Sequence, residues 1–196
     1  MKILVTGGSG YLGLHVRRFF DADDFSRRSS LDILSTIDVS RLTTYDAVIH
    51  LAAHLDKDPE AAELCYRTNA EGTANLLRQM PPNSVFIYAS TKDVYGAHAE
   101  NYEAVPETCA TEYCGQTALE WSKLMGEQYV EYYARQRNLR ACIFRYGRVP
   151  LLQSIQVPAH SCYVRRHSLF DICRDIVSKN RKFLPKSIKR AKGSIE

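Results

Sequence analysis

Three glycines separated by two residues each are the most informative chemical feature of the chain. Gly7, Gly10 and Gly13 follow a short apolar run, residues 3–5, and precede an amphipathic helical pattern, residues 12–20. Glycines permit a tight turn, close approach of a pyrophosphate to the backbone, and close packing of the helix on the strand. The N–H groups at the helix start would face the anion. The pattern predicts a dinucleotide-binding turn in preference to a glycine loop without a ligand.

Charged residues after this helix bear on the type of dinucleotide. A carboxylate at the end of the second strand suits a ribose 2′-hydroxyl, whereas an arginine suits a 2′-phosphate. Arg27 and Arg28 fall at the predicted strand end. Asp23 and Asp24 come earlier, at the strand's start. This order favours NADP over NAD, and the alternative is that the arginines are an ordinary solvated surface.

The elements that must position this turn alternate along the chain. A continuous apolar run bounded by turn residues is typical of a strand buried in a parallel sheet. Alternation of such runs with helical patterns predicts an α/β fold with a doubly wound parallel sheet. The predicted strands include residues 3–5, 47–52, 85–89 and 140–145, and the predicted helices are residues 12–20 and 59–80, a long one including 121–133, and 169–176.

Length and composition set the broad class. The 196 residues fit one domain, and 45% hydrophobic with 24% charged residues is ordinary for a soluble globular protein. No run approaches the ~18 apolar residues of a membrane span. The start of the chain lacks the apolar region of a signal peptide. Six cysteines without a CxxC pair argue against a disulfide framework or a metal site, and predict a cytoplasmic protein with reduced thiols.

The net charge of +4 is concentrated at the end of the chain. Residues 179–196 hold seven basic side chains and one acidic side chain, whereas residues 1–178 carry 19 basic and 21 acidic ones. A basic tail can contact nucleic acid, but a solvated terminus is the commoner case. We therefore do not expect a nucleic-acid partner, and steeply salt-dependent binding would be the sign of one.

Five segments, in the same order along residues 1–150, resemble motifs of the extended short-chain dehydrogenase/reductase family. By pattern, the nearest members are nucleotide-sugar epimerases, dehydratases and 4-keto-sugar reductases, including the dTDP-4-dehydrorhamnose reductases. The resemblance implies a Rossmann fold that binds NAD or NADP. The segments are TGGSGYLG at 6–13, HLAA at 50–53, NAEGT at 69–73, STKDVYG at 90–96 and RYGRV at 145–149.

Matching these segments to the family pattern implies which residues contact the cofactor. Asp32 and Ile33 resemble the pair beside the adenine, although Asp32 is also explained as a plain turn aspartate. Lys123 would hold the nicotinamide ribose. The implied cofactor-binding residues are Gly7, Gly10, Tyr11, Leu12, Gly13, Arg27, Arg28, Asp32, Ile33, Leu51, Ala52, Ala53, Asn69 and Lys123.

The family's catalytic pattern is incomplete in this chain. Members carry a tyrosine four residues before the lysine, on the same helix face, and this tyrosine acts as general acid or base. Lys123 matches the lysine, but Leu119 stands in the tyrosine position. Thr91 matches the hydroxyl residue that binds the substrate oxygen. An exposed helix lysine is the structural alternative for Lys123.

Two residues are candidates to move the proton that the tyrosine would move. Tyr113 would serve if its loop folds over the site, and the favoured alternative is a tyrosine packed on the surface. Asp93 stands where the family's dehydratases carry a glutamate base, and an ion pair of Lys92 with Asp93 on the surface explains it equally well. Water is the third candidate to move this proton.

The second half of the chain is short for the family. Residues 166–177 resemble a later helix start of the family, with only about fifteen residues between Pro150 and this segment. We expect an NAD(P)-binding domain over residues 1–178 whose substrate lobe is truncated from about 150, followed by a basic tail over 179–196. The resemblance also allows a homodimer through the helix that carries Lys123.

Two functions follow as hypotheses. The favoured one is an NAD(P)-dependent oxidoreductase or epimerase of the epimerase/dehydratase type, acting on a nucleotide sugar or a similar keto or hydroxy substrate. The alternative is a non-catalytic NAD(P)-binding regulatory or accessory protein that has lost the tyrosine at position 119.

Overall fold

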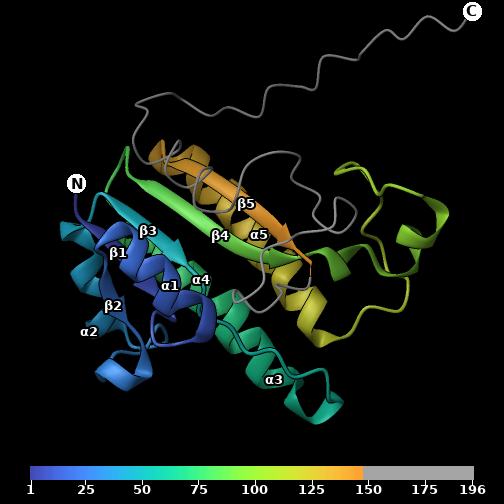
Figure 1. The fold of residues 1–196 in the computed structure, drawn as a ribbon, viewed down its shortest axis with the longest axis horizontal. Coiled ribbons are helices and arrows are strands. Elements are labelled where there is room, and N and C mark those ends of the chain that lie inside the picture. Colours follow the sequence, from blue (N-terminus) through green and yellow to red (C-terminus); the bar gives the residue numbers. More distant parts are fainter. Residues whose placement is uncertain (148–196) are drawn as a thin grey trace, which may run out of the picture.

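The computed structural model describes residues 1–147, which form a five-stranded sheet with all strands parallel (Figure 1). The strand order is β2-β1-β3-β4-β5. The chain thus leaves β1 toward one side of the sheet and returns to its other side, which is a doubly wound topology. The predicted Rossmann fold class is confirmed. The strands are β1 (Ile3–Thr6), β2 (Asp23–Phe25), β3 (Ala47–His50), β4 (Val85–Thr91) and β5 (Arg140–Tyr146).

Helices cover both faces of this sheet, with α1 (Tyr11–Phe20) on one face and α4 (Gly72–Gln79) and α5 (Ala118–Arg137) on the other (Figure 1). Phe86 of β4 belongs to the same core cluster as Leu77 of α4 and Val130 of α5. The next residue, Ile87, belongs to the cluster that contains Val16 of α1. Successive strand residues point to opposite faces, so both faces must be apolar. This explains why the strands appear in the sequence as unbroken apolar runs.

The predicted helix over 59–80 is divided into four pieces. A 3-10 turn (Pro59–Ala61) and α3 (Ala62–Cys65) lead into a π-helical turn (Tyr66–Glu71), and α4 follows. Single π turns inside helices often mark functional sites. Here the π turn carries Asn69, whose carbonyl oxygen accepts a 2.6 Å hydrogen bond from the Thr73 hydroxyl.

The segment between β2 and β3 consists of short turns. A 3-10 turn (Arg27–Ser29) directly follows β2, and α2 (Thr36–Val39) continues into a second 3-10 turn (Ser40–Thr44). The prediction that Asp23 and Asp24 begin the second strand is confirmed. A longer 3-10 segment (Lys92–Asn101) follows β4 and contains a kink at Gly96.

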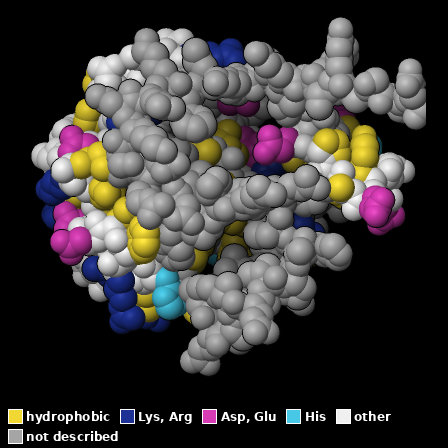
Figure 2. Space-filling view, turned by 45° about the horizontal axis from the view of Figure 1, so that its top comes forward, with side chains coloured by type: hydrophobic (Ala, Val, Ile, Leu, Met, Phe, Trp, Pro, Cys, Tyr) yellow, Lys and Arg dark blue, Asp and Glu magenta, His cyan; other side chains and the backbone are white. Residues whose placement is uncertain are grey.

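The face shown in Figure 2 carries acidic and basic side chains interspersed with hydrophobic ones among the described residues. This mixture fits the near-neutral charge of residues 1–178. The predicted helix at 169–176, the truncated lobe from about 150 and the basic tail at 179–196 lie outside the described residues.

Candidate cofactor and catalytic site

The glycine turn has the geometry needed to receive a pyrophosphate. Gly7 has a φ of +67°, and a side chain there would place its Cβ 2.8 Å from the Ala52 nitrogen. A Cβ on Gly13 would collide with the carbonyl oxygen of Gly7. The Gly10 N–H donates to the same carbonyl oxygen at 2.9 Å and closes the turn. Close packing therefore requires glycine at both ends of the turn.

The first turn of α1 offers its backbone N–H groups to an anion. Gly10 is the N-cap, no side chain caps the helix, and no acidic residue lies in its first turn. Unsatisfied N–H groups and the helix dipole favour a phosphate at such a position. The glycine turn and the helix start together fit the pyrophosphate of a dinucleotide.

The end of β3 lies against the glycine turn. The Ala52 N–H donates to the Thr6 hydroxyl at 3.2 Å, and the Thr6 hydroxyl lies 2.6 Å from His50 Nδ1. The other ring nitrogen of His50 lies 2.9 Å from the Thr73 hydroxyl of α4. Burial lowers the pKa of His50 to about 3, so the ring is neutral at physiological pH. His50 thus joins β1, β3 and α4 behind the segment of Leu51, Ala52 and Ala53.

The charged residues near the end of β2, where the sequence predicts contact with the 2′ position of the ribose, lie in two different environments. Arg27 and Arg28 are exposed directly after β2. Asp24 instead turns inward, where it accepts a 2.9 Å hydrogen bond from the Ser26 hydroxyl and lies 3.7 Å from Arg17. A Cβ on Gly8 would collide with Asp24, so this carboxylate packs against the glycine turn. The exposed charges at the end of β2 are therefore both basic.

The two residues matched to the adenine-binding pair have structural partners. Asp32 accepts a 2.9 Å hydrogen bond from the Leu34 N–H and thus stabilises a turn. Ile33 is 6% exposed, and a Cβ on Gly72 would collide with its side chain. Ile33 therefore packs the loop before α2 against the start of α4.

Lys123 of α5 is a buried lysine, with 4% exposure. Its Nζ donates a 2.7 Å hydrogen bond to the carbonyl oxygen of Ala89 in β4 and lies 5.1 Å from the centre of the Tyr88 ring. Burial lowers its pKa to about 8. The alternative that Lys123 is an exposed helix lysine is wrong, because the side chain points at the end of β4, two residues before Thr91.

Asn69 links the helix of Lys123 to the loop after β3. Its side-chain amide donates to the Ser122 hydroxyl at 2.9 Å and to the His54 carbonyl at 2.9 Å. Its side-chain oxygen accepts from the His54 N–H at 2.8 Å. The predicted cofactor-binding Asn69 thus supports the site from behind, with an exposure of 0%.

The candidates for the missing proton donor differ in placement. Leu119 lies one helical turn before Lys123 and is 6% exposed. Tyr113 lies in the loop before α5 and is 71% exposed, which agrees with the surface alternative. Asp93 lies two residues after the end of β4, where its backbone N–H donates to the Thr91 hydroxyl at 3.2 Å. Asp93 is therefore the candidate that the structure brings beside Thr91.

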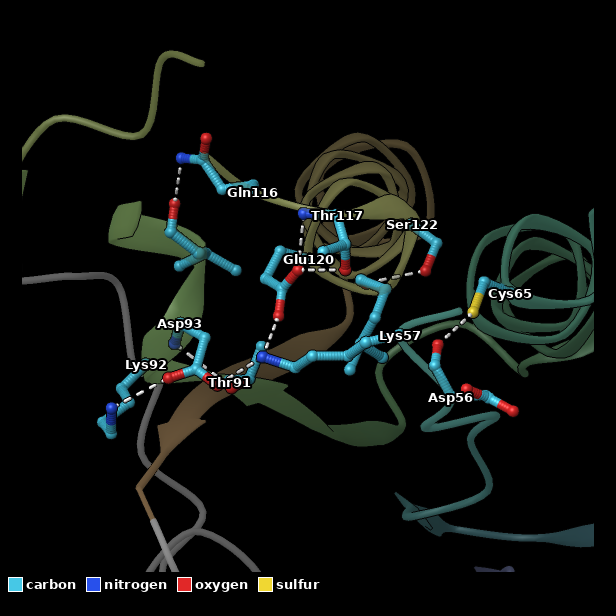
Figure 3. A network of polar contacts seen from close by, with 12 residues as sticks. Asp56, Lys57, Cys65, Thr91, Lys92, Asp93, Gln116, Thr117, Glu120 and Ser122 are labelled. Atoms are coloured by element: carbon cyan, nitrogen blue, oxygen red, sulfur yellow. Dashed lines mark hydrogen bonds and ion pairs between the residues drawn. The ribbon is translucent and has the colours of Figure 1, made fainter. Parts of the chain in front are cut away.

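Asp93 forms the ion pair with Lys92 that the sequence analysis gave as its alternative, and this pair extends to Lys57 and Glu120, which the sequence did not reveal (Figure 3). Its two carboxylate oxygens lie 2.8 Å from Lys92 Nζ and 3.2 Å from Lys57 Nζ. Lys57 Nζ also lies 2.7 Å from Glu120 of α5. Burial raises the pKa of Asp93, but the hydrogen bonds from Lys92 and Lys57 outweigh it and hold the pKa below its usual value. Asp93 is therefore ionised at neutral pH.

Glu120 is fixed in place by the start of α5. It is 2% exposed and accepts a 2.8 Å hydrogen bond from the Thr117 N–H and another from the Thr117 hydroxyl. Burial raises the pKa of Glu120, but the hydrogen bonds from Lys57 and Thr117 together lower it below its usual value. The Thr117-x-x-Glu120 spacing is the signature of a helix capping box, which the sequence could have shown.

A cavity of about 270 Å³ opens where β4 and β5 end. Its lining residues come from the strand ends and the turn after β4, so it lies at the edge of the sheet where ligands bind in this topology. The residues that line it are Thr91, Lys92, Asp93, Tyr146 and Gly147.

A doubly wound sheet with a glycine turn at β1 and a buried lysine at the end of β4 defines a nucleotide-binding Rossmann protein. The chain belongs to the NAD dependent epimerase/dehydratase family, whose model matches residues 3–150. Among residues 1–147 no helix is both long enough and apolar enough to span a membrane.

Individual relatives give the same assignment. The chain is 30% identical to a CDP-paratose 2-epimerase of Salmonella typhi, an alignment that covers 75% of this chain and 57% of the relative. It is 28% identical to a UDP-glucose 4-epimerase of Erwinia amylovora, which covers 69% and 49%. The chain thus spans about half the length of the curated relatives it matches.

Solved structures agree with the fold. A short-chain dehydrogenase/reductase superfamily protein of Agrobacterium tumefaciens with bound NAD matches with a TM-score of 0.64 at 25% identity, over 74% of this chain and 48% of the other. The structure of RMD from Pseudomonas aeruginosa complexed with NADPH matches with a TM-score of 0.62 at 25% identity, over 74% and 52%.

Proposed function

We propose that this protein is an NAD(P)-dependent oxidoreductase or epimerase that acts on a nucleotide sugar. The observation that carries the proposal is that the glycine turn at the carboxyl end of β1, and Thr91 with the buried Lys123 at the carboxyl end of β4, lie along the same edge of the parallel sheet on either side of β3. The CDP-paratose and UDP-glucose epimerases among its relatives are named for nucleotide-sugar substrates, which supports the substrate class.

The cofactor of this proposal is a nicotinamide dinucleotide, with NADP preferred over NAD. Gly7, Gly10 and Gly13 would hold its pyrophosphate, and Arg27 and Arg28 would bind a 2′-phosphate. The two structural relatives bind NAD and NADPH respectively, so both dinucleotides occur in this fold. When bound, the nicotinamide supplies hydride chemistry.

The chain's own residues then position the reacting groups. The Thr91 hydroxyl donates a hydrogen bond to the oxygen on the reacting carbon. Lys123, held by the Ala89 carbonyl at 2.7 Å, donates to the ribose hydroxyls of the cofactor. Asp93, ionised and held between two lysines, accepts the proton of a sugar hydroxyl when that carbon is oxidised.

A non-catalytic NAD(P)-binding protein is the second candidate. Leu119 in the tyrosine position and the 71% exposure of Tyr113 favour it. Loss of a general acid–base group typically costs ~10²–10⁴-fold in rate, so an enzyme without the tyrosine still turns over slowly. Slow turnover therefore supports the enzyme, and no turnover supports the non-catalytic protein.

Turnover of nucleotide sugars tests the proposal. The protein is mixed with NADP⁺ or NAD⁺ and with UDP-, GDP- and CDP-linked hexoses in turn, and reduced nicotinamide is followed by absorbance. Epimerised sugar is followed by chromatography. Turnover that Lys123→Met removes and the exposed-site control Lys2→Met retains supports the proposal. Cofactor binding without turnover of any sugar supports the non-catalytic candidate.

A further inference from the structure

Lys57 is the cation of the site that none of the matched motifs includes. It lies in the loop after β3, and its Nζ sits between Glu120 at 2.7 Å and Asp93 at 3.2 Å (Figure 3). These two carboxylates come from the start of α5 and the end of β4. Lys57 therefore joins three elements at the edge of the sheet where Thr91 ends β4.

The two carboxylates fix the ammonium and leave part of it available. Glu120 cannot swing away, because Thr117 holds it through both its N–H and its hydroxyl. An ammonium has three N–H donors, more than its hydrogen bond to Asp93 and its ion pair with Glu120 require. The Lys57 side chain is 53% exposed, so this ion-paired lysine still faces solvent.

The position of Lys57 corresponds to a gap in the catalytic pattern. Glu120 directly follows Leu119, the residue that replaces the tyrosine. Asp93, the other partner of Lys57, donates its N–H to the Thr91 hydroxyl at 3.2 Å. The ammonium is thus bound between the start of α5, the helix that carries Leu119 and Lys123, and the turn that follows Thr91.

We propose that the Lys57 ammonium replaces the tyrosine hydroxyl as the hydrogen-bond donor to the oxygen on the reacting carbon of the substrate. This inference rests on the proposed function. It makes Lys57 a catalytic residue, Glu120 the positioning residue that holds it, and Thr91 the second donor to the same oxygen.

The ammonium acts through its charge. When hydride adds to a carbonyl carbon, the π electron pair of the C=O bond moves to the oxygen, and a fixed positive donor stabilises that charge. The hydrogen bond to Glu120 is the main cause of a raised Lys57 pKa, so the group stays charged. The oxygen takes its proton from the Asp93 carboxyl, the group that accepts this proton when the alcohol is oxidised. Carbonyl, hydride and proton thus give the alcohol.

A purely structural ion pair makes a different prediction. Ion pairs that are partly buried often add little net stability, and removal of one partner leaves an uncompensated charge. A structural Lys57 would therefore affect unfolding and leave the rate of hydride transfer unchanged. The rate and the unfolding midpoint must be measured on the same variants.

The test combines Lys57→Met with Leu119→Tyr in the full chain. The substrate is whichever UDP-, GDP- or CDP-linked hexose the wild type oxidises fastest, and NADPH binding is measured by nicotinamide fluorescence. Lys57→Met should lower kcat about 100-fold with NADPH affinity unchanged. Adding Leu119→Tyr to this variant should raise its kcat at least about tenfold. The same substitution should raise the kcat of the wild type by a smaller factor. Lys2→Met, which removes an exposed lysine elsewhere, should retain wild-type kcat.

Three results would overturn the inference. The first is wild-type kcat in Lys57→Met, and the second is an equal effect of Leu119→Tyr with and without Lys57. The third is NADPH binding by the wild type without turnover of any hexose, which would contradict the proposed turnover as well and support the non-catalytic NAD(P)-binding protein. Failure of the wild type to bind either dinucleotide would instead contradict the proposed function itself, and this inference with it.

An unstable Lys57→Met variant does not prevent the test. The double variant Lys57→Met/Glu120→Gln leaves no unpaired buried carboxylate, so its unfolding midpoint should return toward that of the wild type. Its kcat should remain about 100-fold low. Wild-type kcat in the folded double variant contradicts the inference.

Discussion

The two halves of the site differ in how closely they keep the family pattern. At the ends of β1 and β3, glycines occupy the positions where a Cβ would collide with backbone, and the first turn of α1 is free of acidic side chains. At the end of β4 and the start of α5, Lys123 is retained, but Leu119 replaces the tyrosine, and Lys57 pairs with one carboxylate after β4 and one in α5. In the first half, backbone geometry limits which residues can stand in the turn. In the second half, the requirement is a hydrogen-bond donor at a given place, which different residues can supply.

This difference has a physical reason. A pyrophosphate is bound by backbone N–H groups, so any side chain in the turn removes the space that it needs. A developing oxyanion needs a fixed donor, and a hydroxyl or an ammonium from another element can supply one. We therefore expect substitutions in the first half to affect binding and those in the second half to affect rate.

Removal of the buried lysine should have the largest effect. Lys123→Met keeps the length of the side chain but loses the donor to the ribose and the charge near Thr91, so kcat should fall about 1,000-fold. Nucleotide-sugar oxidation is the measurement, with Lys2→Met as the exposed control. If kcat falls no further in Lys123→Met than in the control, the second half of the site does not determine the rate.

A methyl group in the glycine turn should weaken binding. Gly13→Ala places a Cβ against the carbonyl oxygen of Gly7, and overpacking of this kind costs ~1–3 kcal/mol of folding stability unless the turn shifts. A shifted turn no longer fits the pyrophosphate, and we expect affinity to fall up to about 100-fold, or roughly 2.7 kcal/mol. NADPH titration by nicotinamide fluorescence measures the change. Leu14→Ala, at a 40% exposed position in the same helix, is the control and should bind normally. Equal affinity of the two variants would contradict the prediction.

Removal of the two arginines should change the choice of cofactor. Arg27→Ala/Arg28→Ala should weaken NADPH binding about tenfold and leave NADH binding unchanged, because a charge-assisted contact to the 2′-phosphate contributes roughly 1.5–3 kcal/mol. Titration with both dinucleotides checks this. A parallel loss for NADPH and NADH would show that the arginines do not read the 2′-phosphate.

Stability at low pH should change through His50. Its pKa in the folded protein is about 3, below the ordinary 6.5, so the unfolded chain binds more protons between these values. The contribution of His50 is fully present above pH 6.5 and declines as pH falls toward 3, by at most about 1.4 kcal/mol per pH unit. Unfolding midpoints between pH 7 and pH 4 should fall more steeply in the wild type than in His50→Gln. Parallel slopes would contradict the buried neutral ring.

Much of the fold could be predicted because its signals are local. Strands buried on both faces appear as unbroken apolar runs, and glycine spacing identified the turn at β1. The π turn around Asn69 was missed because the helical periodicity from 59 to 80 continues through it.

The candidate catalytic network could be predicted only in part. Asp93 was found beside Thr91 because both lie at the end of one strand. Lys57 has no local signal, since its partner Asp93 lies 36 positions away and Glu120 looks like a helix cap in the sequence. The burial of Lys123 likewise depends on packing between α5 and β4, which the sequence does not display.

Binding of reduced dinucleotides to the wild-type chain tests the central claim most directly, because every catalytic proposal depends on an intact cofactor half. The purified protein is titrated with NADPH and with NADH while nicotinamide fluorescence is followed. Saturable binding of both, tighter for NADPH, is the predicted result. Absence of binding for either dinucleotide would contradict the account, and would reduce the glycine turn to a feature of the fold alone.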